Sequence, residues 1–187
     1  MEDLAKGLGI SKKTIYQHFE NKDDLVMQWS MDNLKGLVCQ WEECALAGKN
    51  AIDEVFLFLS KHLDMVIKMN SLVLHDLVKY HPACVEVLRE YRANTERERF
   101  KILILRGIAE GLFRKDLDWQ VLSRLQLLTK DVCMSQENFP ANEFNIFKVI
   151  KEVTINFLTG LSTLKGHAVI DEYRNMMNQE QYSGIAC

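Results

Sequence analysis

The most constraining feature of this chain is a helical spacing of apolar residues that recurs along most of its length. Apolar side chains stand three and four positions apart from Ile52 to Ile67 and again from Phe144 to Leu164, which is typical of amphipathic helices. Only 2 of the 187 residues are proline, and no window alternates for long with the period of a strand. The sequence therefore predicts an all-α fold built as a helical bundle.

Several residues predict where these helices begin and end. Asn50 and Asp118 can each accept a hydrogen bond from the first turn of a following helix. Pro82 suits a first turn, because the backbone N–H that it lacks would have no partner there. The clearest loop covers residues 135–142. We expect one long last helix to continue to Leu164, with a weaker helical segment after Gly166.

Other sequence features argue against several classes of protein. The five cysteines are odd in number and form no C-x-x-C pair, so neither a disulfide framework nor a zinc knuckle is indicated. The spacings E-x-x-H and H-x-x-x-H do not occur, and no nucleophile motif or phosphate loop stands out. Apolar runs are too short to cross a bilayer, and the start does not resemble a signal peptide. We expect a cytoplasmic non-enzyme with reduced thiols and without catalytic residues, cofactor, metal site or membrane contact.

The first residues differ from the rest of the chain. A short helix over residues 2–7, a tight turn at Gly9, a cap at Ser11 and a second short helix over residues 12–19 are typical of a helix-turn-helix. Ala5 is expected where the two helices cross, because a larger side chain there would push them apart. The small core of the unit is expected to consist of Leu4, Leu8, Ile10, Ile15 and Phe19. We expect residues 1–24 to form this unit and residues 25–187 to form a helical regulatory and dimerisation domain.

The second short helix carries chemistry suited to DNA. Between Leu4 and Phe19 there are three lysines and no acid, in a chain of net charge −3, so a local rather than a global charge favours nucleic acid. A major groove admits one helix, and hydrogen-bonding side chains there read base edges while others hold phosphates. The hydrogen-bonding residues of this helix and its ends are Ser11, Lys12, Lys13, Thr14, Tyr16, Gln17 and His18.

The segment from Glu2 to Leu25, with its run GIS..T.Y.HF..K..L, resembles the DNA-binding signature of the tetracycline-repressor-like (TetR) family. Segments 76–82, 107–114 and 160–166 are also similar to family members. The resemblance implies a homodimeric regulator, usually a repressor, that binds a palindromic operator, holds a small-molecule effector and dimerises through its last two long helices. By the family's pattern the base-reading residues are Lys12, Lys13, Thr14 and Gln17, and the phosphate-binding residues are Tyr16, His18 and Lys22.

The sequence departs from the family pattern at one place. Family members have a further helix before the position of Met1, and it completes the core of their DNA-binding unit. We therefore expect an upstream helix in the natural chain, and partly exposed apolar side chains on the two short helices in its absence. The alternative is a dimeric small-molecule-binding or interaction module that has lost DNA binding.

An effector pocket is expected between helices of the second domain, for an apolar or amphipathic molecule. Helical spacing alone does not separate pocket residues from core residues, so the same side chains are alternatively part of the core. The two histidines of this domain's helices, His62 and His75, are expected to be structural or polar pocket residues rather than metal ligands. The candidate lining residues are Trp29, Phe58, His62, Met65, Met69, His75, Tyr80, Phe100 and Met134.

Overall fold

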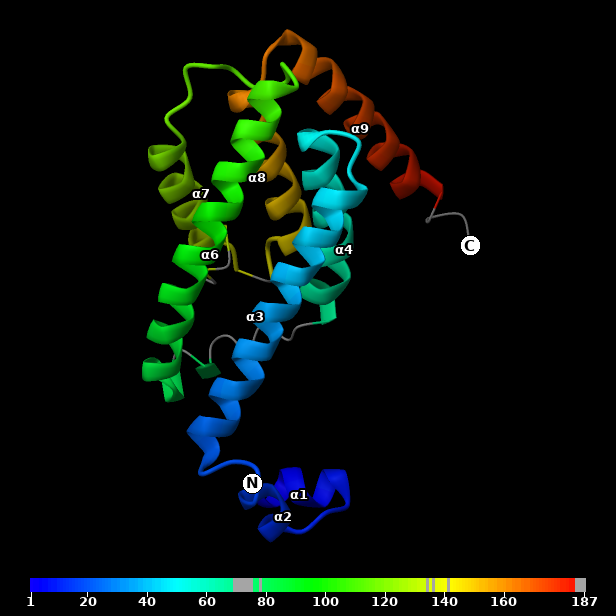
Figure 1. The fold of residues 1–187 in the computed structure, drawn as a ribbon. Helices are drawn as coiled ribbons and strands as arrows, with labels where there is room; N and C mark the ends of the chain where they lie inside the picture. The colour runs from blue at the N-terminus through cyan, green and yellow to red at the C-terminus, as the bar shows by residue number, and fades with distance from the viewer. Residues whose placement is uncertain (69–75, 78, 134, 136, 141, 184–187) are drawn as a thin grey trace.

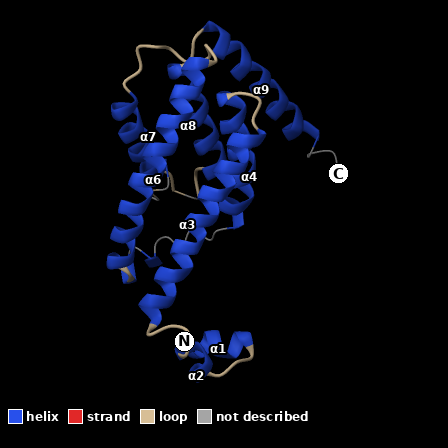
Figure 2. Cartoon of the chain, viewed as in Figure 1, coloured by secondary structure: helices blue, strands red, loops and turns tan. Residues whose placement is uncertain are grey.

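The computed structural model describes the chain except for residues 69–75, 78, 134, 136, 141 and 184–187, and side chains are described outside 62–75 and 177–187. Within those limits the fold is all-α, as predicted, with no strand in the described residues (Figure 2). In the part of the chain that the structure describes, the helices with defined bounds are α1 (Glu2–Leu8), α2 (Lys12–Tyr16), α3 (Lys22–Ala47), α4 (Ala51–Lys68), α6 (Pro82–Ala109), α7 (Trp119–Cys133), α8 (Ile146–Leu161) and α9 (Leu164–Ser183).

The helices are arranged as a bundle with a small unit at one end (Figure 1). Helices α3, α4, α6, α7 and α8 pack against one another, and α9 lies against α4 and α8. Helix α3 extends beyond the bundle and leads to α1 and α2, which lie together beyond its first turn (Figure 1). The expected boundary between residues 24 and 25 therefore falls within the first turns of a continuous helix.

The predicted helix starts are confirmed by their hydrogen bonds. The Asn50 carboxamide oxygen accepts from the backbone N–H of Ile52 at 3.0 Å and of Asp53 at 2.9 Å. The Asp118 carboxylate accepts from the N–H of Gln120 at 2.9 Å. Pro82 is the first residue of α6. These caps satisfy amide donors that have no partner inside their own helix.

The expectation of one unbroken last helix to Leu164 is wrong. Helix α8 ends at Leu161, because Ser162 is extended, with φ −84° and ψ 152°, and pairs with Phe113 in an isolated β-bridge. The Thr163 N–H then donates to the Leu112 carbonyl at 2.9 Å, and α9 begins at Leu164. Gly166 lies inside α9, against the Leu112 carbonyl and the Ser162 side chain.

These contacts join the two glycine-containing segments, 107–114 and 160–166. Gly111 takes a left-handed conformation, with φ +71°, which residues with a Cβ adopt at a cost. Its carbonyl accepts from the Thr163 hydroxyl at 2.8 Å, and the Arg114 N–H donates to the Leu161 carbonyl at 2.9 Å. The end of α6 is thereby fixed to the junction between α8 and α9.

Gly107 makes room for the fully buried ring of Phe113. A Cβ at this position would collide with that ring, and a packed core has no empty space to receive it. We expect Gly107→Ala to lower the free energy of unfolding by about 1–3 kcal/mol, the usual effect of overpacking. Urea denaturation measures the change, and Gly36→Ala, where the added Cβ has no atom within 4 Å, is the matched control. Equal effects at the two glycines would contradict this reading.

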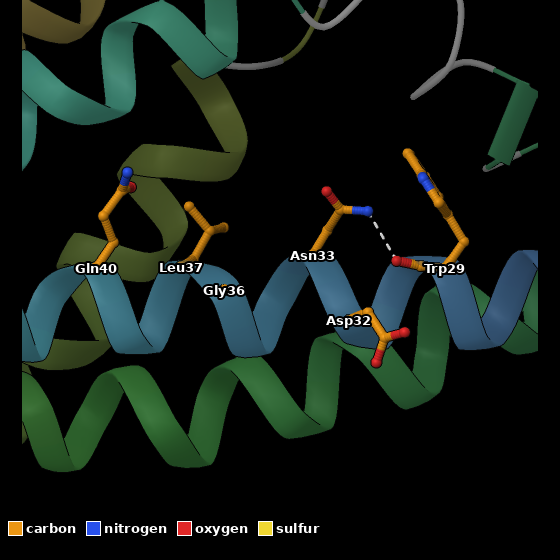
Figure 3. A pocket seen from close by; sticks show the side chains of 6 residues that line it. All are labelled: Trp29, Asp32, Asn33, Gly36, Leu37 and Gln40. Carbon is orange, nitrogen blue, oxygen red and sulfur yellow. Dashed lines mark hydrogen bonds between the residues drawn. The ribbon is translucent and has the colours of Figure 1, made fainter.

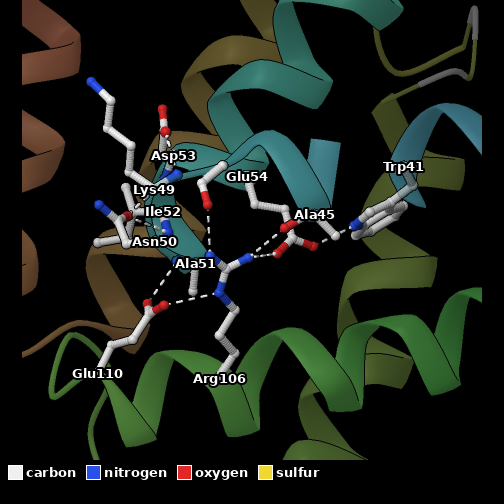
Figure 4. A network of polar contacts seen from close by, with 11 residues as sticks. Trp41, Ala45, Lys49, Asn50, Ala51, Ile52, Asp53, Glu54, Arg106 and Glu110 are labelled. Carbon is white, nitrogen blue, oxygen red and sulfur yellow. Dashed lines mark hydrogen bonds and ion pairs between the residues drawn. The ribbon is translucent and has the colours of Figure 1, made fainter. Parts of the chain in front are cut away.

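A polar network centred on Arg106 ties α3, α4 and α6 together (Figure 4). The Arg106 guanidinium donates to the Ala45 carbonyl at 2.9 Å, to the Gly48 carbonyl at 2.7 Å and to Glu54 at 3.0 Å. Trp41 Nε1 also donates to Glu54, at 2.8 Å. Burial raises the pKa of Glu54, while Trp41 and Arg106 act against that rise. The network fixes the C-terminal end of α3 in the bundle.

Candidate nucleic-acid interface

Helices α1 and α2 form a helix-turn-helix, as predicted, but the second helix ends at Tyr16 and not at Phe19, because the chain turns at Gln17 and His18. Gly9 ends α1 in a left-handed conformation, with φ +65°, and the Ile10 N–H donates to the Ala5 carbonyl at 3.0 Å. Ala5 and Ile15 are buried where the two helices meet. Leu4, Leu8 and Ile10 were expected to contribute to this small core and are 39%, 61% and 42% exposed. For Leu4 and Leu8 this agrees with the expectation of partly exposed apolar side chains on the two short helices.

Ser11 and Thr14 fix the start of α2. The Ser11 hydroxyl oxygen accepts from the Thr14 N–H at 3.0 Å and lies 2.9 Å from the Thr14 hydroxyl. Ser11 is thus a helix cap, which is the role that its position predicts. Thr14 is half-buried, so these two side chains mainly set the position of α2 in the unit.

The remaining predicted DNA-binding side chains are exposed. Lys12 forms an ion pair with Glu2 at 2.6 Å, and both side chains are largely exposed. Exposed ion pairs contribute little free energy, so a phosphate or base can replace Glu2 at small cost. The sequence analysis missed Glu2 as a partner. Besides Ser11, which is also exposed, the exposed residues of the predicted set are Lys12, Lys13, Tyr16, Gln17, His18 and Lys22.

The turn between α2 and α3 is held by Asp24, which the sequence analysis did not single out. Its carboxylate accepts from the Glu20 N–H at 2.9 Å and from the Gln28 side chain at 2.9 Å. These two hydrogen bonds, with that of Gln28 the larger influence, lower the pKa of Asp24. Asn21 caps α3 by accepting from the Asp24 N–H at 2.9 Å. The orientation of α2 relative to α3 is therefore set by several local hydrogen bonds.

The structure places the predicted effector-pocket residues in different surroundings. Phe100 is buried in the core, with its ring 5.8 Å from that of Phe157. Phe58 is half-buried and packs on Trp41 at 4.7 Å between ring centroids. Trp29 and Tyr80 are exposed and line two separate depressions. The side chains of His62, Met65, Met69, His75 and Met134 lie outside the described residues.

One of these depressions, of about 420 Å³, lies along one side of α3 (Figure 3). Trp29, Asn33, Leu37 and Gln40 project from the same side of this helix, while Asp32 points away (Figure 3). The buried Gln40 side-chain oxygen has no hydrogen-bond partner among the described residues. Sequence analysis identified only Trp29 here, although the spacing of 29, 33, 37 and 40 is helical and was a usable signal.

Comparisons with known proteins agree with this geometry. Residues 1–28 match the model of the family described as bacterial regulatory proteins, tetR family. Among solved structures, the chain is similar to the ketosteroid transcriptional regulator KstR2 of Mycobacterium tuberculosis, with a TM-score of 0.61 and 20% identity over 86% of this chain and 83% of that one. No curated protein matches the chain. At 20% identity, this structural similarity shows only that the two chains share a fold.

The N-terminal unit is a helix-turn-helix, and its sequence is similar to the matched segment of bacterial regulatory proteins of the tetR family. The matched segment and the shared fold together support a TetR-family regulator. No described helix is both long enough and apolar enough to span a membrane. The described residues also contain no cluster of three or more histidine, cysteine, aspartate or glutamate side chains that could hold a metal ion.

Proposed function

We propose that this chain is a homodimeric cytoplasmic repressor that binds a palindromic operator and is released from it by a small-molecule effector. The proposal is carried by one observation: α2 and the turn directly after it present Lys13, Tyr16, Gln17 and His18 to solvent at the end of a helix-turn-helix. In this orientation the side chains are free to enter a major groove, whose width suits one helix. Lys22 begins α3 directly beyond the turn, where a cation suits a flanking phosphate.

The apolar surface of α7 supports the dimer. Val121, Leu125, Leu128 and Val132 are 59%, 49%, 63% and 48% exposed, and their spacing of four, three and four places them on one side of the helix. Apolar residues at this spacing form the contact surface between paired helices. A two-fold axis beside α7 would cover each stripe with its copy on the partner, with α8 as the neighbouring helix.

The depression on α3 is the proposed effector site. Trp29 and Leu37 supply apolar walls, and Asn33 and Gln40 supply neutral amides, which suits an apolar molecule with a hydrogen-bonding group. Because α3 continues from this depression to the helix-turn-helix, a ligand that displaces α3 also moves α2. Effector and operator would then favour different positions of the two recognition helices, so each would weaken binding of the other.

Duplexes selected from a random library by the full chain test the DNA-binding function. We expect enrichment of one inverted repeat, and binding that weakens steeply between 50 and 200 mM salt, as contacts to about 6–10 phosphates predict. A chain that binds a small molecule and dimerises but enriches no sequence would instead support the module that has lost DNA binding.

Base reading and phosphate binding make different predictions for substitutions in this interface. Gln17→Ala should weaken the selected duplex by about 1–3 kcal/mol and relax the preference at one base position, because a lost base contact affects that position alone. Lys22→Ala should weaken all duplexes alike and lower the salt slope by about one. Fluorescence anisotropy on duplexes with single base changes measures both. Equal weakening of every duplex by Gln17→Ala would contradict its assignment to base reading.

A further inference from the structure

The two ends of α3 are held to α6 by contacts of very different strength. At the C-terminal end, Arg106 of α6 donates to the carbonyls of Ala45 and Gly48 and to Glu54. At the N-terminal end, Asp23 in the first turn of α3 contacts His81, which lies at the N-cap position directly before α6. The His81 Nδ1 atom lies 2.5 Å from the Asp23 carboxylate. One end of α3 is thus anchored by several hydrogen bonds, and the other by this contact.

The geometry of His81 suits it to hold α3 in place. Its side chain is only 9% exposed, whereas that of Asp23 is 79% exposed. Its backbone is fixed, because its N–H donates to the Leu77 carbonyl at 2.9 Å and its carbonyl accepts from the Val85 N–H at 3.2 Å. An Nδ1–H donor is available in one neutral tautomer and in the protonated ring. The His81 imidazole at the start of α6 is therefore fixed in position, whereas the Asp23 carboxylate that it contacts is largely exposed and can move into solvent.

The position of this contact connects it with the DNA-binding unit. Asp23 follows Lys22, the proposed phosphate ligand, and precedes Asp24, whose carboxylate holds the turn from α2. The depression along α3 at Trp29–Gln40 lies between the two anchored ends of this helix. A change in the direction of α3 is therefore resisted by Arg106 at its far end and by His81 at the end that carries α2.

We propose that the contact between His81 and Asp23 is a latch that sets the orientation of the helix-turn-helix relative to the bundle. The two residues are positioning residues that act through α3 and need not touch DNA. This inference deepens the proposed function, on which its effect on operator binding rests. With the latch closed, the two recognition helices of a dimer keep one separation; with it open, the first turns of α3 move and that separation varies.

A double-mutant cycle on the full chain tests the latch without DNA. His81→Phe keeps the ring and removes Nδ1, and Asp23→Ala removes the carboxylate. Each should speed amide hydrogen exchange at residues 24–28 by about threefold or more, because the first turns of α3 open more often. The double variant should be no faster than the faster single variant, since partners in one contact are not additive. Multiplied effects, or no effect, would overturn the latch.

Binding to DNA provides the second readout. The probes are a duplex selected by the wild-type chain from a random library and the same duplex with one half-site scrambled. We expect His81→Phe to change affinity for the intact duplex at least threefold and to leave affinity for the scrambled one unchanged. Asp23→Ala also removes an exposed charge, so for this variant we expect the ratio of intact to scrambled affinity to change at least threefold. Glu20→Ala removes a nearby exposed acid that has no ion pair among the described contacts, and it should shift both affinities alike. Equal shifts in all three variants would mean a charge effect and no latch.

The two readouts separate the failure of the latch from the failure of the proposed function. If the wild-type chain selects no duplex, the proposed function is wrong, and the exchange cycle still decides whether the latch exists. If the chain selects a duplex but the ratio of intact to scrambled affinity does not change, the latch has no part in operator binding.

Discussion

Replacing Arg106 with methionine should lower the free energy of unfolding by up to about 3–5 kcal/mol, the usual consequence of leaving a buried charge without its partner. Glu54 is 4% exposed, and without Arg106 its charge would keep only the hydrogen bond from Trp41. The carbonyls of Ala45 and Gly48 would also lose a donor, which adds to the loss. Urea denaturation measures this change in the free energy of unfolding.

Two further variants make that result specific to the network. Arg89→Met removes an arginine that pairs at 3.0 Å with Glu86, where both side chains are more than 60% exposed, and it should change stability by less than about 1 kcal/mol. The double variant Arg106→Met with Glu54→Gln should recover part of the loss, because the uncompensated charge is then absent. A small effect of Arg106→Met, similar to that of Arg89→Met, would contradict the described role of the network.

Placing a glutamate at Leu128 should separate the proposed dimer into monomers. Leu128 is 63% exposed in the single chain, so the substitution does not disturb the core of a subunit. In a two-fold interface the change occurs twice, and each buried, unpaired charge costs several kcal/mol. The dissociation constant should therefore rise by about a thousandfold or more, since 1.4 kcal/mol corresponds to tenfold.

Sedimentation equilibrium over a range of concentrations measures this shift. Leu46→Glu is the control, because Leu46 is 89% exposed near the end of α3 and lies outside the α7 stripe. That variant should dimerise as the wild type does. A Leu128→Glu chain that remains a dimer at micromolar concentration would show that the stripe on α7 is not the interface.

Features that depend on neighbouring residues were predictable from the sequence. Ser11, Asn50 and Asp118 accept hydrogen bonds from residues two or three positions ahead, so the sequence alone contains both partners. The turn at Gly9 is similar, because its left-handed conformation follows from the short connection between two helices. The helix-turn-helix was therefore predicted almost completely, except that α2 ends at Tyr16 and not at Phe19 and that Ile10 is exposed.

Features that depend on distant residues were not predictable. The break after Leu161 depends on the pairing of Ser162 with Phe113, and the helical spacing continues through it to Leu164. Arg106 bonds to groups more than 50 positions away, and its local ion pair with Glu110, four residues on, does not reveal those distant partners. Phe100 and Trp29 both lie on helices with apolar spacing, yet one is 3% and the other 48% exposed. Only the packing of the bundle decides whether such a side chain is buried in the core or lines a surface depression.

Selection of duplexes from a random library, followed by measurement of the mass of the complex, tests the central claim most directly. The account predicts one enriched inverted repeat whose half-site centres lie about one helical turn, or a multiple of it, apart. It also predicts two chains on each duplex, and loss of the enrichment when the chain carries Gln17→Ala together with Lys13→Ala. A library that remains random after repeated rounds with the dimeric chain would contradict a DNA-binding regulator.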